Sequence, residues 1–256
     1  MIRQLPHAGP VAVARRLIGP IPPAAAIPVY GMSLAPPARL AGSPLIPDRL
    51  EAALAGYAAG WSDPEPRAVA TQFSKYWFRA AIPPVVVCAA AGRAAPEVAP
   101  DALRVEPDGA GIPFLVAPDD PAIGIAPADG AALMDRLVRG HLEPVVAALA
   151  ARSGLAPRVF WSNAGNVIAW YLEQLRAQPA TADAARALAA HWVEATANPH
   201  FDGRNPMSKP VIDTTDAHGR PVRRRRVCCA RYLSAELDVC GSCPLSSAPA
   251  ARRAKR

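Results

Sequence analysis

Apolar side chains recur every three or four residues along much of the chain, which is the spacing of one face of an α-helix. The clearest stripe follows Pro66, a residue type that often opens helices, and it predicts a buried helix face. This stripe consists of Val69, Phe73, Tyr76, Trp77 and Ala80. Further helices are predicted from Asp48 to Gly60, after Asp129 with a break or restart at Pro144, and from Thr181 to Glu194.

The helix predicted after Pro157 has two distinct sides. Its apolar stripe predicts a contact with the core and consists of Phe160, Ala164, Ile168, Tyr171 and Leu175. Asn163, Asn166 and Trp170 share another side. These polar groups either satisfy buried backbone and neighbouring loops or, together with Trp161, line a binding pocket.

Alternating apolar residues between Leu103 and Val116, on either side of Pro107-Asp108-Gly109, predict a β-hairpin. Pro113 is expected to keep its strand at a sheet edge, because proline cannot donate a ladder hydrogen bond. The predicted fold class is therefore mainly α with a small β-hairpin or sheet (α+β).

Length and composition predict one main globular domain with an appendage, because 256 residues with 51% hydrophobic content can form a sizeable core. No apolar run reaches the roughly 18 residues that a membrane span needs. The predicted organisation comprises a Pro/Ala-rich segment (1–47), a mainly helical domain (48–220), a cysteine-containing segment (221–245) and a basic disordered tail (246–256).

Four of the five cysteines lie within sixteen residues, as Cys228-Cys229 followed by Cys240 and Cys243. Thiolates that close together repel one another, so a bound cation is expected to compensate their charge. Ligation by four cysteines is typical of 2Fe-2S clusters, although structural zinc or disulfides are alternatives. The fifth thiol, Cys88, lies in an apolar run and is expected to be an inert core residue.

Five prolines interrupt the first 27 residues, so no uninterrupted apolar region of a secretory signal is visible. A four-cysteine disulfide framework would also be unusual in a chain of this length. Reduced thiols and a cytoplasmic location are therefore expected.

The Cys-Cys-x10-Cys-x2-Cys arrangement resembles the FhuF-type ferric-siderophore reductase family, and a second, softer resemblance covers Phe160 to Asn166. The resemblance implies a 2Fe-2S cluster held by the four cysteines, a helical domain related to siderophore-synthetase palm domains, and reduction of a hydroxamate-like ferric siderophore. The polar side of the helix after Pro157 makes Trp161, Asn163, Asn166 and Trp170 the substrate-binding candidates. No dinucleotide or phosphate-binding glycine motif is present, so an external electron-donor protein is expected. Peripheral association with the inner membrane is a further expectation.

The net charge of +7 is concentrated at the carboxyl end, where residues 221–256 hold nine basic and two acidic side chains. Arg223, Arg224, Arg225 and Arg226 directly precede the cysteines and would favour the more negative, reduced state of a cluster. A solvated basic tail and guidance of an anionic partner are alternative roles. Two alternative functions remain, a non-enzymatic iron-sulfur carrier or sensor and a zinc-stabilised nucleic-acid-binding module, while the reductase interpretation expects no nucleic acid.

Overall fold

The computed structural model describes residues 32–35, 48–107, 113–118, 129–216 and 218–245. Within them the chain is mainly α-helical with three small sheets, as the sequence predicts. The helices are α2 (Asp48–Ala58), α3 (Pro66–Ala91), α4 (Gly130–Leu137), a π-helical turn η3 (Val138–Leu142), α5 (Glu143–Ser153), α6 (Pro157–Arg176), α7 (Ala182–Ala189) and a second π-helical turn η4 (Ala190–Glu194). The shorter elements are β1 (Met32–Ala35), β2 (Arg104–Pro107), β3 (Pro113–Pro118), β4 (Ala197–Asn198), the 3₁₀ turn η5 (Pro199–Phe201), β5 (Gly203–Arg204), β6 (Val211–Thr215), β7 (Pro221–Arg225) and the 3₁₀ turn η6 (Arg231–Leu233).

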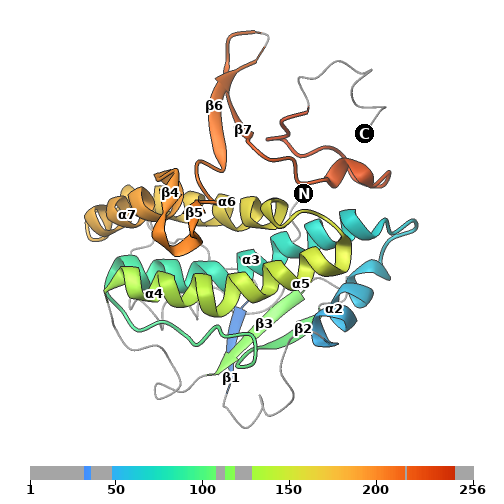
Figure 1. Ribbon diagram of the computed structural model, residues 1–256, viewed down its shortest axis with the longest axis horizontal. Coiled ribbons are helices and arrows are strands. Elements are labelled where there is room, and N and C mark those ends of the chain that lie inside the picture. Colours follow the sequence, from blue (N-terminus) through green and yellow to red (C-terminus); the bar gives the residue numbers. More distant parts are fainter. Residues whose placement is uncertain (1–31, 36–47, 108–112, 119–128, 217, 246–256) are drawn as a thin grey trace.

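Helix α3 is the central element of this arrangement (Figure 1). Glu65 caps its start by accepting a hydrogen bond from the backbone N–H of Ala68 at 2.9 Å, and Gly92 ends it in the left-handed conformation at φ 62°. The helix continues through Pro83 and Pro84. It contacts α2, α4, α5, α6, α7, β3 and η6, so it joins nearly every part of the fold.

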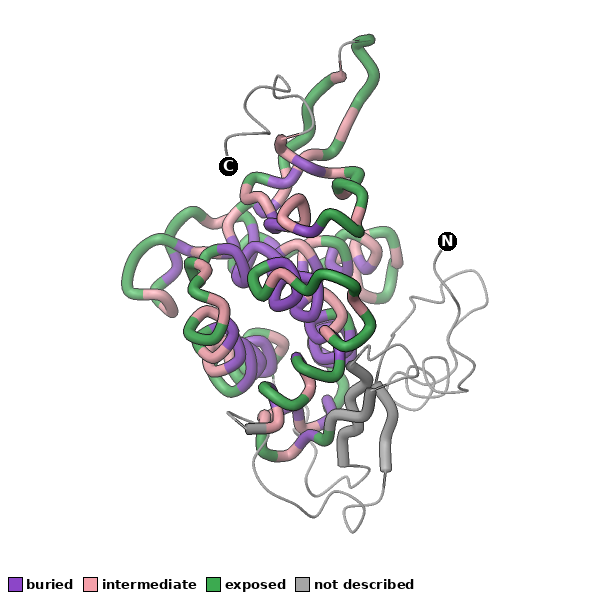
Figure 2. Tube along the Cα trace, turned by 90° about the vertical axis from the view of Figure 1, so that its right-hand side faces the viewer, coloured by how far each residue is buried: buried purple, intermediate pink, exposed green. Residues whose placement is uncertain are grey.

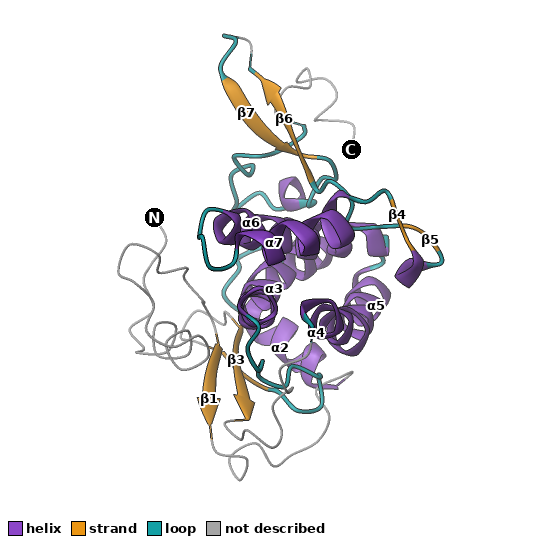
Figure 3. Ribbon diagram, turned by 90° about the vertical axis from the view of Figure 1, so that its left-hand side faces the viewer, coloured by secondary structure: helices purple, strands orange, loops and turns teal. Residues whose placement is uncertain are grey.

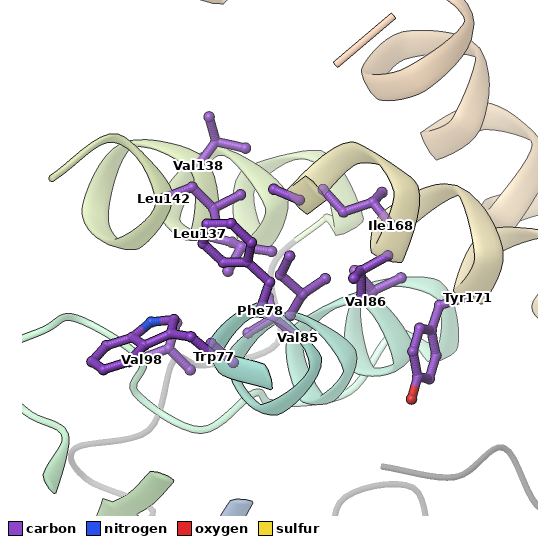
Figure 4. Packing of buried hydrophobic residues seen from close by; sticks show 14 of the residues in the cluster. Trp77, Phe78, Val85, Val86, Val98, Leu137, Val138, Leu142, Ile168 and Tyr171 are labelled. Carbon is purple, nitrogen blue, oxygen red and sulfur yellow. The ribbon is translucent and has the colours of Figure 1, made fainter. Parts of the chain in front are cut away.

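The helices α2 to α7, with η3 and η4, form what we call the helical body, and its core is continuous (Figures 2 and 4). The largest fully buried side chains include Trp77, Phe78 and Phe160, from α3 and α6. The apolar stripe predicted on α6 is confirmed, because all five of its members are buried. In the stripe predicted on α3, all except the half-buried Tyr76 are buried.

The sequence also predicts the ends of these helices. Asp129 caps α4 by accepting from the backbone N–H of Ala132 at 2.7 Å. The predicted restart occurs at Pro144, which lies in the first turn of α5, where its missing N–H costs no helical hydrogen bond. The π-helical turn η3 bridges α4 and α5 without a loop.

The predicted hairpin of β2 and β3 is confirmed, but the expectation that Pro113 keeps its strand at an edge is wrong. Strand β3 is the central strand of the order β1-β3-β2, because β1 pairs with it in parallel. The register explains why the proline is tolerated there. The β1 ladder begins at Leu115, so Pro113 opens the strand outside that ladder and faces only Pro107 of β2.

The β6–β7 hairpin and the chain that follows it lie across the helical body from the β1-β3-β2 sheet (Figures 1 and 3). The chain leading into this hairpin passes close to Gly165 of α6. A Cβ at that glycine would lie 3.0 Å from the Met207 Cβ and 3.1 Å from its carbonyl oxygen. None of the helices in the described ranges is long and apolar enough to cross a membrane.

Candidate metal centre

The four cysteines lie in a segment with little regular structure, residues 226–245, which we call the cysteine segment. Cys229 and Cys243 are buried, whereas Cys228 and Cys240 are half-buried. The Cys229 and Cys240 sulfurs are 3.9 Å apart. Ala230 adopts the left-handed conformation at φ 54°, so the chain turns sharply directly after the adjacent pair.

Hydrogen bonds from β7 hold the carboxyl-terminal end of this segment. The N–H of Arg225, at the end of β7, donates to the Ser242 carbonyl at 2.8 Å, and the Arg224 guanidinium donates to the Cys243 carbonyl at 3.1 Å. Within the turn, the Cys243 N–H donates to the Cys240 carbonyl at 2.9 Å. Strand β7 therefore fixes the Cys-x-x-Cys turn next to its own end.

A second attachment lies in the middle of the cysteine segment. Glu236 accepts a hydrogen bond from the backbone N–H of Asp63, in the loop between α2 and α3, at 2.7 Å. Hydrogen bonds from Asp63 and Ser62 lower the pKa of the Glu236 carboxyl, so it remains charged in this contact.

Lys75, from α3, contacts the site directly, although the sequence analysis did not single it out. Its ammonium donates to the Cys229 sulfur at 3.1 Å and to Gln72 Oε1 at 3.0 Å. The signal in the sequence was the set of polar residues Thr71, Gln72, Ser74 and Lys75 within a largely apolar helix. At helical spacing these four residues share one side of α3, opposite the core residue Phe73.

Arg225 is the second cation at the site, and its side chain is only 5% exposed. Its guanidinium donates to the side-chain oxygen of Asn163 on α6. Asn163 in turn donates to Ser74 Oγ at 2.8 Å and to the Thr71 carbonyl at 3.3 Å. The same turn of α3 that carries Lys75 therefore supports Arg225 through one intervening amide.

The other arginines of the predicted run make different contacts. Arg223 forms an ion pair with Glu173 of α6, and both side chains are largely exposed. Arg226 is exposed, while Arg224 contacts the Cys243 carbonyl. Within the run from Arg223 to Arg226, only Arg225 is buried.

The positive groups change the acidity of the thiols. The hydrogen bond shared with Cys240 lowers the pKa of Cys229, and Lys75 and Arg225 lower it further against the opposing effect of burial. The same hydrogen bond raises the pKa of Cys240. Burial raises the pKa of Cys228, which also senses the charges of Cys229 and Cys243. The four thiols therefore form one electrostatically connected group.

The substrate-binding candidates on α6 occupy different environments. Asn163 is buried and hydrogen bonded as described above, which matches the alternative that it satisfies internal groups. Trp161 is 8% exposed and packs edge-on against Phe201. Asn166 is half-buried, and Trp170 is 40% exposed. Asn166 and Trp170 are therefore the more exposed of the four candidates.

Within the described ranges, no three His, Cys, Asp or Glu side chains surround a single point as metal ligands. The donor set nevertheless fits an anionic, sulfur-rich group. Four thiols are gathered beside an ammonium and a buried guanidinium, and the buried Nε–H of Arg225 has no acceptor among the described residues. A buried N–H without an acceptor is costly, and a cluster sulfur or thiolate is an acceptor of the required kind.

Cys88 takes no part in this centre. It is fully buried within α3, and burial raises the pKa of its thiol well above the ordinary value. This confirms the prediction of a core thiol.

Residues 71–215 match the protein family described as ferric iron reductase FhuF-like transporter. The ferric siderophore reductase of Escherichia coli (strain K12) is 32% identical over 112 residues, which is 44% of this chain and 40% of that protein. The match therefore spans less than half the length of this relative. The family region includes Lys75 and Asn163 but ends before Cys228.

Proposed function

The chain belongs to the FhuF-like ferric iron reductase family, and from that premise we propose that it reduces siderophore-bound ferric iron in the cytoplasm by one-electron transfer. The observation that supports this proposal most directly is the grouping of four cysteines beside two cations, Lys75 and Arg225. The proposed substrate is a hydroxamate-like ferric siderophore, in keeping with the name of the Escherichia coli relative.

Cys228, Cys229, Cys240 and Cys243 are the proposed ligands of a 2Fe-2S cluster, which when bound supplies a centre that gains and loses one electron. The buried Cys229 and Cys243 close the inner side of the site to water. The half-buried Cys228 and Cys240 leave its outer side accessible for electron exchange. No general acid, base or nucleophile is required for such a transfer.

Reduction releases the iron because siderophores bind it through hard oxygen donors, which suit ferric iron far better than ferrous iron. Each tenfold preference for the ferric form lowers the potential of the chelate by about 59 mV. A low-potential donor is therefore needed. Iron-sulfur clusters cover roughly −700 to +450 mV, so this requirement lies within their range.

An external protein is the proposed electron donor. Val239, next to Cys240, and Ile212, on β6, are 47% and 48% exposed, and the exposed Arg226 lies two residues before Cys228. Exposed apolar side chains beside a positive charge suit a transient contact with an acidic electron carrier. The chelate is proposed to bind near Asn166 and Trp170, and association with the inner membrane is proposed to be peripheral.

The test begins with protein purified without oxygen, in which iron, sulfide and zinc are measured per chain. Equal amounts of iron and sulfide, followed by rapid oxidation of the reduced protein by a ferric hydroxamate, are expected. Cys88→Ser is the matched control and should keep the cluster, whereas Cys243→Ser should lose it. Stoichiometric zinc without iron would contradict the proposal and favour the zinc-stabilised module. A cluster that does not react with ferric chelates would instead indicate a carrier or sensor.

A further inference from the structure

One turn of α3, from Thr71 to Lys75, holds both cations of the cysteine site. Lys75 reaches the Cys229 sulfur directly, at 3.1 Å. Thr71 and Ser74 accept hydrogen bonds from Asn163, whose oxygen accepts from Arg225. Both positive charges are thus fixed relative to the cysteines by a helix that is itself packed into the core.

The side chain of Lys75 is held in place by its neighbours. Gln72, which is 3% exposed, accepts from the ammonium at 3.0 Å and donates to Thr71 Oγ1 at 3.1 Å. Across the described residues, neither Lys75 nor Arg225 forms an ion pair with a carboxylate. No carboxylate among the described residues therefore competes with the cysteine sulfurs for these two positive charges.

We propose that Lys75 is a positioning residue of this centre: it binds the Cys229 sulfur and, together with Arg225, makes the site easier to reduce. This inference rests on the proposed function and deepens it. The physical reason is that a four-thiolate 2Fe-2S cluster is anionic and gains a further negative charge when it takes up an electron. A half-buried cation in hydrogen-bond contact with a ligand sulfur stabilises that extra charge, because water screens it poorly there.

The position of a cation decides how strongly it acts on the site. Arg226 is closer to the cysteines in sequence than Lys75 is, but its side chain is exposed. Charges in water are screened, so its effect on the reduced state is expected to be small. Arg226 therefore provides a matched comparison in which a single positive charge is removed from the solvent side.

The experiment measures the reduction potential of the loaded protein and of Lys75→Met, Lys75→Gln, Lys75→Arg and Arg226→Gln. Removing the Lys75 charge is expected to favour the oxidised form. At a fixed applied potential, the ratio of reduced to oxidised protein should fall at least tenfold. This change corresponds to about −59 mV for one electron. Lys75→Arg and Arg226→Gln should change the ratio less than threefold.

Iron and sulfide content provides a second measurement that does not depend on activity. If Lys75→Met and Lys75→Gln lose the cluster while Lys75→Arg keeps it, the requirement for the charge is supported. Loss in all three variants would assign Lys75 to packing and overturn the inference. A loaded Lys75→Met protein with the potential of the parent would overturn it as well.

The same experiment separates this inference from the proposed function. If the unmodified protein contains no iron and sulfide, both the proposed function and the role of Lys75 are wrong. If the unmodified protein carries the cluster and reduces ferric chelates, but the Lys75 variants keep its reduction potential, only the role of Lys75 is disproved.

Discussion

The helical body and the cysteine segment are stabilised by different interactions. In the body, apolar side chains from α3, α4, α5 and α6 form one buried cluster. The last described residue of that cluster is Met207, so the cysteine segment adds nothing to it. Instead, the segment is held by hydrogen bonds to β7, to Asp63 and to Lys75. Burial of apolar side chains is therefore the main interaction within the body, whereas the described contacts of the cysteine segment are polar.

The largest effect is expected when one of the proposed cysteine ligands is removed from the cysteine segment. Cys243→Ser is expected to abolish bound iron and sulfide, because a serine oxygen is a poor replacement for a buried thiolate ligand. The thermal unfolding midpoint of the helices, followed by far-ultraviolet circular dichroism, should change little. A large fall in that midpoint would show that the two regions unfold as one unit.

A cavity in the core of the helical body should lower the stability of the helices, unlike the loss of Cys243. Phe78→Ala removes a fully buried ring and is expected to lower the free energy of unfolding by about 3–5 kcal/mol. Denaturant titration measures this loss. Ile212→Ala, at a largely exposed position on β6, is the control and should remain within about 0.5 kcal/mol of the parent. Equal losses in both variants would contradict the contrast between the regions.

A fall in pH is expected to destabilise the helical body through His141. Burial lowers the pKa of this imidazole from 6.5 to about 4, and the neutral ring accepts from Trp77 and bonds the Val98 carbonyl. Because the unfolded chain takes up the proton at higher pH, this stability is complete above pH 6.5 and is lost as the pH falls toward 4. The loss amounts to about 3 kcal/mol.

The measurement is the free energy of unfolding between pH 7 and pH 4, compared with that of His141→Gln. The variant is expected to be less stable at pH 7 but to lose less as the pH falls. Parallel curves for both proteins would show that His141 does not cause the dependence.

The smallest expected loss of stability comes from replacing Asn163, which links α3 of the helical body to Arg225 at the end of β7. Asn163→Leu leaves Arg225 and Ser74 buried without their amide partner and should cost about 1–3 kcal/mol. Asn166→Ala, three residues later on the same helix at a half-buried position, should cost less than about 0.5 kcal/mol. If Asn163 were instead a chelate contact, its replacement would weaken chelate binding and leave stability unchanged.

The helices of the body could be predicted from the sequence because each is specified by residues close together in the chain. The stripes on α3 and α6, the cap at Asp129 and the restart at Pro144 each follow from a few neighbouring residues. The central place of β3 could not be predicted, since its second partner, β1, lies about 80 residues earlier in the sequence. Pairing at that distance leaves no periodic signal around Pro113.

The cysteines of the candidate site could be singled out from the sequence, but the residues that contact them could not. The spacing of Cys228 to Cys243 identifies the thiols, because a metal centre requires specific donors close together. The helical spacing places Asn163 on a side of α6, but it does not reveal that this side faces α3 and Arg225. Lys75 lies more than 150 residues before Cys229, so only tertiary packing brings the ammonium to the sulfur.

The attachment of the cysteine segment by hydrogen bonds near Arg225 and Glu236 has a consequence for how the protein matures. A strip of chain fastened in this way is expected to open while the helices stay folded. If the proposed cluster is bound, its iron and sulfide would then reach a finished scaffold in which Lys75 already lies on its helix. Oxidative loss of that inorganic core would leave the scaffold intact and ready to be refilled.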